Sequence, residues 1–173
     1  MNSHDDCSCG CGCCGVSPDK QLLIEFLYLD LSTCDRCQGT EAALDAAVAD
    51  VTPALNAAGY GIEVQKIFID SREMALQHRF LSSPTIRVNG RDIAAQVKET
   101  GCECCGDICG EDVDCRVWEY EGREYTTPPK ALIAAGILRA AFKDTPLDEA
   151  PYILPGNLER FFSGKDAQNP DTL

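Results

Sequence analysis

The run Leu22-Leu-Ile-Glu-Phe-Leu-Tyr-Leu29, with Cys34-Asp-Arg-Cys37 starting five residues beyond its end, constrains the architecture of this 173-residue chain more than any other segment. The apolar run is nearly continuous, which is typical of a strand buried on both faces of an α/β sheet. Beyond the two cysteines the spacing of apolar residues becomes helical. The sequence therefore predicts that Cys34 and Cys37 lie on a turn that leads from a strand into a helix.

The segments that follow predict two helices separated by a strand. Apolar residues recur at helical spacing over 38–58, and Pro53 is expected to kink or split this helix. A second strand is predicted at 62–69. Asp70 is expected to cap a short helix that ends near Leu81. Right-handed crossovers would make these elements a βαβα unit with parallel strands.

The second half of the chain predicts a strand pair and a final helix. A third strand is expected at 84–88, and Asn89-Gly90 is a strong signal for a two-residue turn. Residues 116–120 are predicted to form the next strand, and Pro128-Pro129 opens a helix with one apolar face. The predicted class is α/β, a βαβα–ββα three-layer sandwich in which residues 91–115 are inserted before the last strand.

The length fits one domain with tails. Residues 1–20 contain cysteines, glycines and polar residues without apolar periodicity, so a flexible cysteine-rich arm is expected unless a metal orders it. The domain is predicted to span 21–142. A proline-containing tail is expected over 143–173, with one short helix near 158–162 that packs on the domain.

Charge and hydropathy exclude several classes of partner. The formal net charge of −13 argues against binding to nucleic acid or to anionic membranes. The chain opens without a secretory signal pattern and has no apolar run near the roughly 20 residues that span a bilayer. We therefore expect a cytoplasmic protein. In a reducing cytosol, clustered cysteines more often bind metal or exchange disulfides than cross-link a fold.

This order of elements, with Cys34-x-x-Cys37 on the first strand-to-helix turn and Ser83-Pro84-Thr85 before the third strand, resembles the thioredoxin and glutaredoxin fold over residues 21–142. The resemblance implies that the peptide bond before Pro84 is cis and that Pro84 lies against the two sulfurs. It also implies that Thr85 offers backbone groups to an extended substrate. The Trp-Cys-Gly-Pro-Cys context of thioredoxin is absent, which argues against general reduction of protein disulfides.

A narrower resemblance comes from the cysteine-rich segment and the Trp-Glu-Tyr-Glu-Gly sequence at 118–122. Together they look like an uncharacterised thioredoxin-like family of bacteria and archaea that is described only as a domain of unknown function. Some of its members are associated with arsenic-resistance gene neighbourhoods. The resemblance thus implies a role in arsenic resistance as the biological context.

Cys34 and Cys37 are the candidate catalytic residues, together with Pro84. A thiolate at Cys34 would lie at the positive end of the helix dipole, and Arg36 adds a second positive influence. Cys34 is then the attacking thiol and Cys37, one helical turn later, the resolving thiol. Capture of a metal or metalloid by the same pair, and a pair of inert thiols, are the alternatives.

The twelve cysteines fall into groups of five, two and five. Thiolates favour soft ions, and the last group contains enough sulfurs for a Cys₄ zinc site or a three-thiolate metalloid site. Because adjacent cysteines rarely chelate one small ion, Cys102, Cys105 and Cys109 are expected to form that site. Disulfides that pin the segment, and an arm without a fixed site, are the alternatives. The candidate metal ligands are Cys102, Cys104, Cys105, Cys109, Cys115, Cys7, Cys9, Cys11, Cys13 and Cys14.

The leading hypothesis is a thioredoxin-like protein that exchanges disulfides at Cys34 and Cys37 and binds a soft metal or metalloid through its other cysteines, in arsenic or mercury detoxification. Its partners would be such an ion, zinc included, or a thiol/disulfide partner protein, and no organic cofactor is predicted. The second hypothesis is a non-enzymatic protein that binds or delivers zinc, copper(I) or arsenite. The third is an iron–sulfur protein, since four cysteines per cluster are available.

Overall fold

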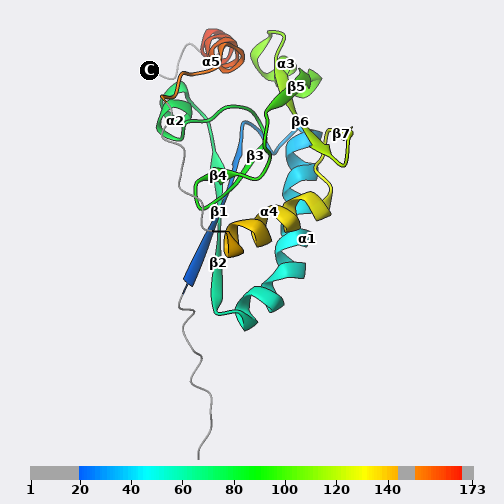
Figure 1. Cartoon of the computed structure of the whole chain (residues 1–173). Coiled ribbons are helices and arrows are strands. Elements are labelled where there is room, and N and C mark those ends of the chain that lie inside the picture. The colour runs from blue at the N-terminus through cyan, green and yellow to red at the C-terminus, as the bar shows by residue number, and fades with distance from the viewer. Residues whose placement is uncertain (1–19, 144–150, 169–173) are drawn as a thin grey trace, which may run out of the picture.

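The computed structural model describes residues 20–143 and 151–168, and it confirms the α/β class (Figure 1). Within these residues the strands are β1 (Lys20–Tyr28), β2 (Tyr60–Phe68), β3 (Thr85–Val88), β4 (Arg91–Asp92), β5 (Lys98–Gly101), β6 (Asp114–Tyr120) and β7 (Arg123–Tyr125). The helices are α1 (Asp35–Ala57), α2 (Arg72–Gln77), α3 (Glu103–Cys109), α4 (Lys130–Phe142) and α5 (Gly156–Gln168). Across the same residues, none of the helices is both long and apolar enough to cross a bilayer.

The first sheet has four strands in the order β2-β1-β3-β4. Strands β1 and β2 are parallel because α1 connects them as a crossover, whereas β3 is antiparallel to both β1 and β4. The Asn89-Gly90 turn between β3 and β4 is confirmed, and both residues have positive φ angles, 50° and 76°. Such angles suit Asn and Gly and match the twist of a tight hairpin.

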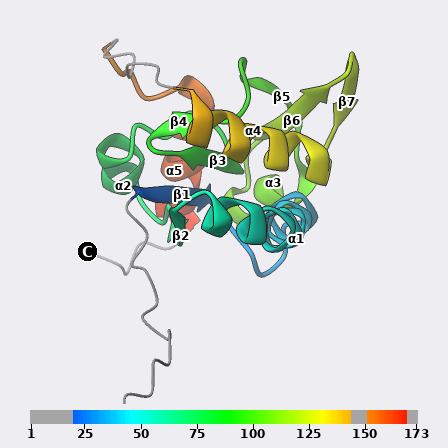
Figure 2. The ribbon, with the colours of Figure 1, turned by 60° about the horizontal axis from the view of Figure 1, so that its bottom comes forward.

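One face of this sheet carries the larger apolar core. Leu22, Ile24 and Phe26 alternate along β1 and are buried against α1 and α4, which lie side by side (Figure 1, Figure 2). The intervening residues Leu23 and Glu25 are only half-buried. The prediction that β1 is buried on both faces is therefore wrong for this part of the strand, because no described helix covers the opposite face there.

A second apolar cluster forms at the end of the molecule toward which β1 runs, where α2, α3 and α5 gather (Figure 1). Leu27 of β1 and Leu29, just beyond the strand, enter it beside Phe161 and Phe162 of α5. Buried cysteines make up much of the remainder of this cluster. The thiol chemistry of the chain is therefore concentrated within a packed interior.

The pairing of the predicted strand at 116–120 needs correction. It forms within β6, but β6 pairs with β5 and β7 in a separate three-stranded sheet and not with β3. The partner of β3 is β4, whose two residues are too few to give a periodic signal in the sequence. The cysteine-rich segment therefore follows the last strand of the first sheet and does not interrupt its final hairpin.

Two predictions about the helices also need correction. Helix α1 passes through Pro53 as one helix, so of the two predicted outcomes, a kink or a split, the split does not occur. Helix α2 is capped by Ser71, whose hydroxyl accepts a hydrogen bond from the backbone N–H of Met74 (3.3 Å), and not by Asp70 as predicted. Ser is as effective a cap as Asp, and here it stands in the position that the helix geometry requires.

The predicted helix at 158–162 lies in the first half of α5, which packs against α3. Asn157 fixes its start because the amide side chain accepts from the backbone N–H of Asp114 (3.0 Å) and donates to its carbonyl (2.6 Å). The same amide donates to Glu99 at 3.2 Å. Helix α5 is thus tied to β5 and β6, the strands that flank the cysteine-rich helix.

Candidate metal centre

Cys34 is held at the N-cap of α1, where its side chain is completely buried. The carboxylate of Asp30 shapes the preceding loop by accepting hydrogen bonds from the backbone N–H groups of Thr33 (2.7 Å) and Cys34 (3.0 Å). Partial burial acts to raise the pKa of Asp30, but hydrogen bonds from Ser32 and Thr33 hold it below its ordinary value. An ionised Asp30 therefore orders the turn that presents Cys34.

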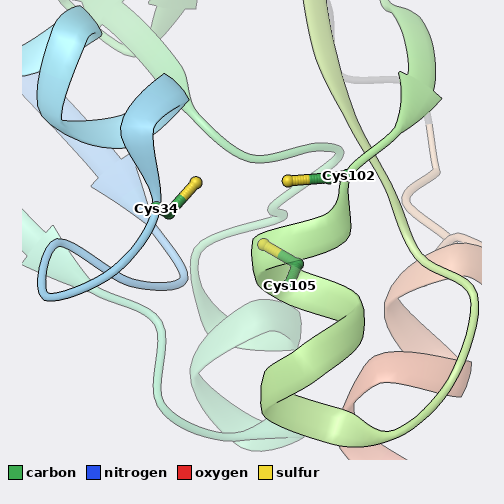
Figure 3. Close-up of side chains that lie close together, drawn as sticks. All are labelled: Cys34, Cys102 and Cys105. Atoms are coloured by element: carbon green, nitrogen blue, oxygen red, sulfur yellow. The ribbon is translucent and has the colours of Figure 1, made fainter.

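Two further thiols come from α3. Cys102 is the N-cap of that helix and Cys105 lies in its first turn, and both are buried. The Sγ atoms of Cys34, Cys102 and Cys105 all lie within 4.8 Å of one another. Figure 3 shows the three sulfurs pointing into the same space from the starts of α1 and α3. The fold thus brings together cysteines that are 68 residues apart in the sequence.

Cys115 and Cys37 border this group. Cys115 lies on β6, is fully buried, and places its Sγ 3.2 Å from the Sγ of Cys105. Cys37 lies one turn into α1, and its Sγ is 3.4 Å from the hydroxyl of Ser83. The Ser83–Pro84 peptide bond is cis, as the resemblance to thioredoxin implied.

Arg36, the third residue of the Cys34-Asp-Arg-Cys37 motif, holds the two halves of the site together. Its Nη1 donates to the carbonyl oxygens of Thr100 (3.2 Å) and Cys115 (3.0 Å). Its Nη2 donates to the carbonyl of Gly101 (2.7 Å). The sequence suggested that Arg36 acts by its charge on Cys34, but its guanidinium is engaged with the backbone of β5 and β6.

The pKa values of the clustered thiols are shifted in opposite directions. A hydrogen bond with Cys102, and then one with Cys105, lowers the pKa of Cys34 well below its ordinary value, although burial acts to raise it. Hydrogen bonds with Cys105 and Cys115 lower the pKa of Cys102 to about 7. A hydrogen bond with Cys34 is the largest cause that raises the pKa of Cys37, and a hydrogen bond with Cys102 is the largest cause for Cys105 and Cys115. Burial raises the pKa of all three thiols as well. Negative charge therefore gathers on Cys34 and Cys102, and neighbouring thiols donate to it.

Other predicted ligands lie apart from this group or outside the described residues. Cys104 is half-buried beside it, and the buried thiol of Cys109 donates to the carbonyl of Cys105 (3.3 Å). Cys34 therefore takes the place that the sequence suggested for Cys109. The seven cysteines between residues 20 and 143 are all free thiols, so the disulfides considered for this segment are not formed there. Cys7, Cys9, Cys11, Cys13 and Cys14 lie outside the described residues.

An acidic groove of about 1210 Å³ runs beside Cys102 along α3. Among the described residues that line it, Arg160 of α5 carries the one cationic side chain. The potential next to the thiols is therefore negative, which favours the approach of cations over that of anions. The carboxylates that line the groove belong to Glu103, Asp107, Glu111, Asp112 and Asp114.

The fold and the site define an α/β protein with a buried group of cysteine thiols that can hold a metal ion. Residues 22–137 match the family model described as "Domain of unknown function (DUF2703)", and the chain belongs to this family. No curated protein and no solved structure matches the chain. The geometry of the thiols is therefore the main basis for a functional proposal.

Proposed function

We propose that the protein binds a soft metal or metalloid ion through the thiolates of Cys34, Cys102 and Cys105. The observation that carries the proposal is the convergence of their three Sγ atoms within 4.8 Å in a buried position. A zinc–sulfur bond is about 2.3 Å, so two sulfurs on one ion are at most about 4.6 Å apart, and about 3.8 Å in a tetrahedral site. Side-chain adjustments of roughly 1 Å or less would close the thiols around a single ion.

The donor set narrows the class of ion. Thiolates bind zinc, copper(I), cadmium, mercury(II) or arsenite in preference to hard cations such as Mg²⁺ or Ca²⁺. Three thiolates satisfy a trivalent arsenic centre. The lowered pKa values of Cys34 and Cys102 ease the loss of their protons when an ion binds, whereas the raised pKa of Cys105 means that this third ligand must be deprotonated by the ion itself. We extend the proposal to detoxification of arsenic or mercury in the cytoplasm, which is supported by the family resemblance given above.

We also infer a thioredoxin-like core over residues 21–142. It is supported by the strand order β2-β1-β3-β4, with parallel β1 and β2 and an antiparallel hairpin at the other edge. The position of Cys34 at the start of the first helix supports it as well. In this proposal residues 1–20 are a cysteine-rich arm and 143–173 a tail.

The test is an elemental analysis and a set of ion titrations. Because the arm could bind metal independently, they use the full-length chain in which its five cysteines are replaced by Ser, called here the arm-substituted chain. Under reducing, anaerobic conditions it should bind one equivalent of zinc, cadmium or arsenite. Replacement of Cys34, Cys102 or Cys105 by Ser should weaken this binding, while Cys104→Ser should not. The positions replaced in the arm are Cys7, Cys9, Cys11, Cys13 and Cys14.

Two results would contradict metal binding at this site: no ion bound by the arm-substituted chain, or equal losses from Cys104→Ser and Cys105→Ser. Visible absorption after anaerobic purification, with iron and sulfide in the elemental analysis, would favour the iron–sulfur alternative instead.

The second candidate function is dithiol/disulfide exchange with a partner protein at Cys34 and Cys37. It is supported by the lowered pKa of Cys34, because a thiolate is the attacking species, and by the location of Cys37 one helical turn away. A Cys37→Ser variant should then retain a mixed disulfide on Cys34 when it is incubated with a disulfide-bonded peptide. A non-enzymatic metal carrier with the ligands proposed above would form no such adduct, and its metal affinity would stay nearly unchanged because Cys37 is not one of those ligands.

A further inference from the structure

We propose that Cys115 is the fourth thiolate of this site, so that Cys34, Cys102, Cys105 and Cys115 together enclose a tetrahedral ion such as zinc or cadmium. This inference rests on the proposed metal binding and deepens it. The Sγ of Cys115 lies 3.2 Å from that of Cys105, nearer than the edge of about 3.8 Å expected in a Cys₄ zinc site. Cys115 is also fully buried, so its sulfur is directed into the protein.

The backbone of Cys115 is held in place from two sides. In the second sheet Cys115 pairs with Thr100 of β5, and the carbonyl of Cys115 accepts a hydrogen bond from Arg36 at 3.0 Å. Cys102 follows directly after β5, and its N–H donates to the carbonyl of Val113 at 2.8 Å. The two strands therefore position Cys102 and Cys115 relative to each other, and Arg36 positions both relative to α1.

The other two buried thiols are less suitable as a fourth ligand. The Sγ of Cys37 contacts the Ser83 hydroxyl at 3.4 Å, and that of Cys109 donates to the carbonyl of Cys105 at 3.3 Å. Cys115 has its closest recorded side-chain contact with a member of the thiol group itself. Of the buried thiols outside the group of three, Cys115 is therefore the one whose recorded side-chain hydrogen bond is made with a sulfur of that group.

A fourth thiolate determines which ions the site holds. Zinc and cadmium prefer four ligands in a closed structural site, whereas three thiolates satisfy a trivalent metalloid. Loss of Cys115 should therefore weaken binding of zinc and cadmium and leave binding of arsenite nearly unchanged. A closed Cys₄ site also leaves no position for a substrate water, so it suits storage, transfer or structural binding of the ion and not metal-assisted hydrolysis.

The decisive measurement is X-ray absorption of the zinc-loaded, arm-substituted chain, which counts the sulfurs around zinc. Four sulfurs are expected for the unsubstituted site, and three sulfurs with one lighter atom for Cys115→Ser. Zinc affinity of Cys115→Ser should fall by on the order of 100-fold or more, because even loss of a group that supports a ligand costs about 10–100-fold. Cys104→Ser is the matched control and should retain four sulfurs, and Cys37→Ser tests the competing assignment of the fourth position.

Three sulfurs around zinc in the unsubstituted site would overturn the proposal, and this count does not depend on the folding of any variant. A loss of one sulfur in Cys37→Ser, with four retained in Cys115→Ser, would assign the fourth position to Cys37 and overturn it as well. Failure of the arm-substituted chain to bind zinc, cadmium and arsenite would instead refute the proposed function itself. Arsenite binding that survives in Cys115→Ser while zinc binding falls would support both.

Discussion

The guanidinium of Arg36 donates a hydrogen bond to the backbone carbonyl of Cys115 at 3.0 Å, and so joins the motif at the start of α1 to the strand that carries another buried thiol. The same side chain reaches Gly101, the residue before Cys102. Arg36 thus hydrogen-bonds to the backbone at Cys115 and next to Cys102, while it lies two residues from Cys34 in the sequence. The motif therefore supplies a connection from α1 to β5 and β6 as well as its thiols.

We predict that Arg36→Ala weakens ion binding although Arg36 is not itself a ligand of the ion. The substitution removes three hydrogen bonds from a charged donor. Each such bond stabilises a fold by about 1.5–3 kcal/mol, and by less where solvent reaches it. The free energy of unfolding should fall by roughly 1–3 kcal/mol. Zinc affinity should fall about 10–100-fold, as for other groups that position ligands.

Urea denaturation and competitive zinc titration of the arm-substituted chain measure the two effects. Arg123→Ala, on the exposed surface of β7, is the matched control and should leave both quantities nearly unchanged. Equal zinc affinity in Arg36→Ala and the unsubstituted protein would show that β5 and β6 hold their positions relative to α1 without Arg36.

We predict that zinc protects the buried thiols from alkylation and stabilises the fold. An ion that binds only the folded state adds about 2.7 kcal/mol at a concentration 100 times its dissociation constant. Iodoacetamide should therefore react far more slowly with Cys34, Cys102 and Cys105 after zinc is added, and a chelator should reverse this. Cys104 is half-buried outside the group and serves as an internal control whose rate should not change. Mass spectrometry of alkylated peptides resolves each site, and equal protection of Cys104 would indicate general compaction and not coordination.

Local patterns accounted for the longer elements of the fold. The strand at 22–29, the helix from 38 and the Asn89-Gly90 turn depend on neighbouring residues, and each is found near its predicted place. Strand β4 has two residues and β5 is short, polar and partly exposed, so neither produces apolar alternation. The pairing of β6 with β5 was missed for the same reason.

The composition of the site could be only partly predicted. The Cys34-x-x-Cys37 spacing drew attention to the start of α1, and Cys102-x-x-Cys105 repeats that spacing at the start of α3. The repetition is a signal that could have paired Cys102 with Cys105 and left Cys109 out. The approach of Cys34 to these two thiols is a long-range contact, which no local spacing encodes. Likewise, nothing in the sequence indicated that Arg36 would bond to backbone carbonyls.

The packing of α5 on α3 gives a prediction about Gly164. A Cβ atom at this position would lie 2.6 Å from the carbonyl oxygen of Cys109, a backbone atom that cannot easily move. Gly164→Ala should therefore destabilise the protein by about 1–3 kcal/mol, despite the better helix propensity of Ala. Gly101→Ala is the matched control, since its Cβ meets nothing within 4 Å, and its effect should stay within about 0.5 kcal/mol. The midpoints of urea denaturation compare the two, and a neutral Gly164→Ala would mean that α5 packs less closely on α3 than described.

Arg116 supplies a further prediction because its side chain is completely buried. Its Nη2 lies 2.7 Å from a carboxylate oxygen of Asp92, out of line for a hydrogen bond, so the contact is an ion pair. Its Nη1 donates to the hydroxyl of Thr85 (2.9 Å), and the guanidinium lies 4.7 Å from the ring centre of Trp118. Arg116 thereby connects β6 to β3 and β4 of the other sheet.

Asp92→Asn should destabilise the protein by about 3–5 kcal/mol, because it leaves the buried cation of Arg116 without its counter-charge. Arg116→Met combined with Asp92→Asn should be more stable than Asp92→Asn alone, since the double change removes the stranded charge and keeps an apolar side chain in its place. Asp45→Asn, which affects an exposed ion pair with Lys66, is the control and should cost no more than about 1 kcal/mol. Urea denaturation of the three variants measures these differences. A double variant that is less stable than Asp92→Asn would mean that the contacts of Arg116 with Thr85 and Trp118, and not its pairing with Asp92, account for most of its contribution to the junction of the two sheets.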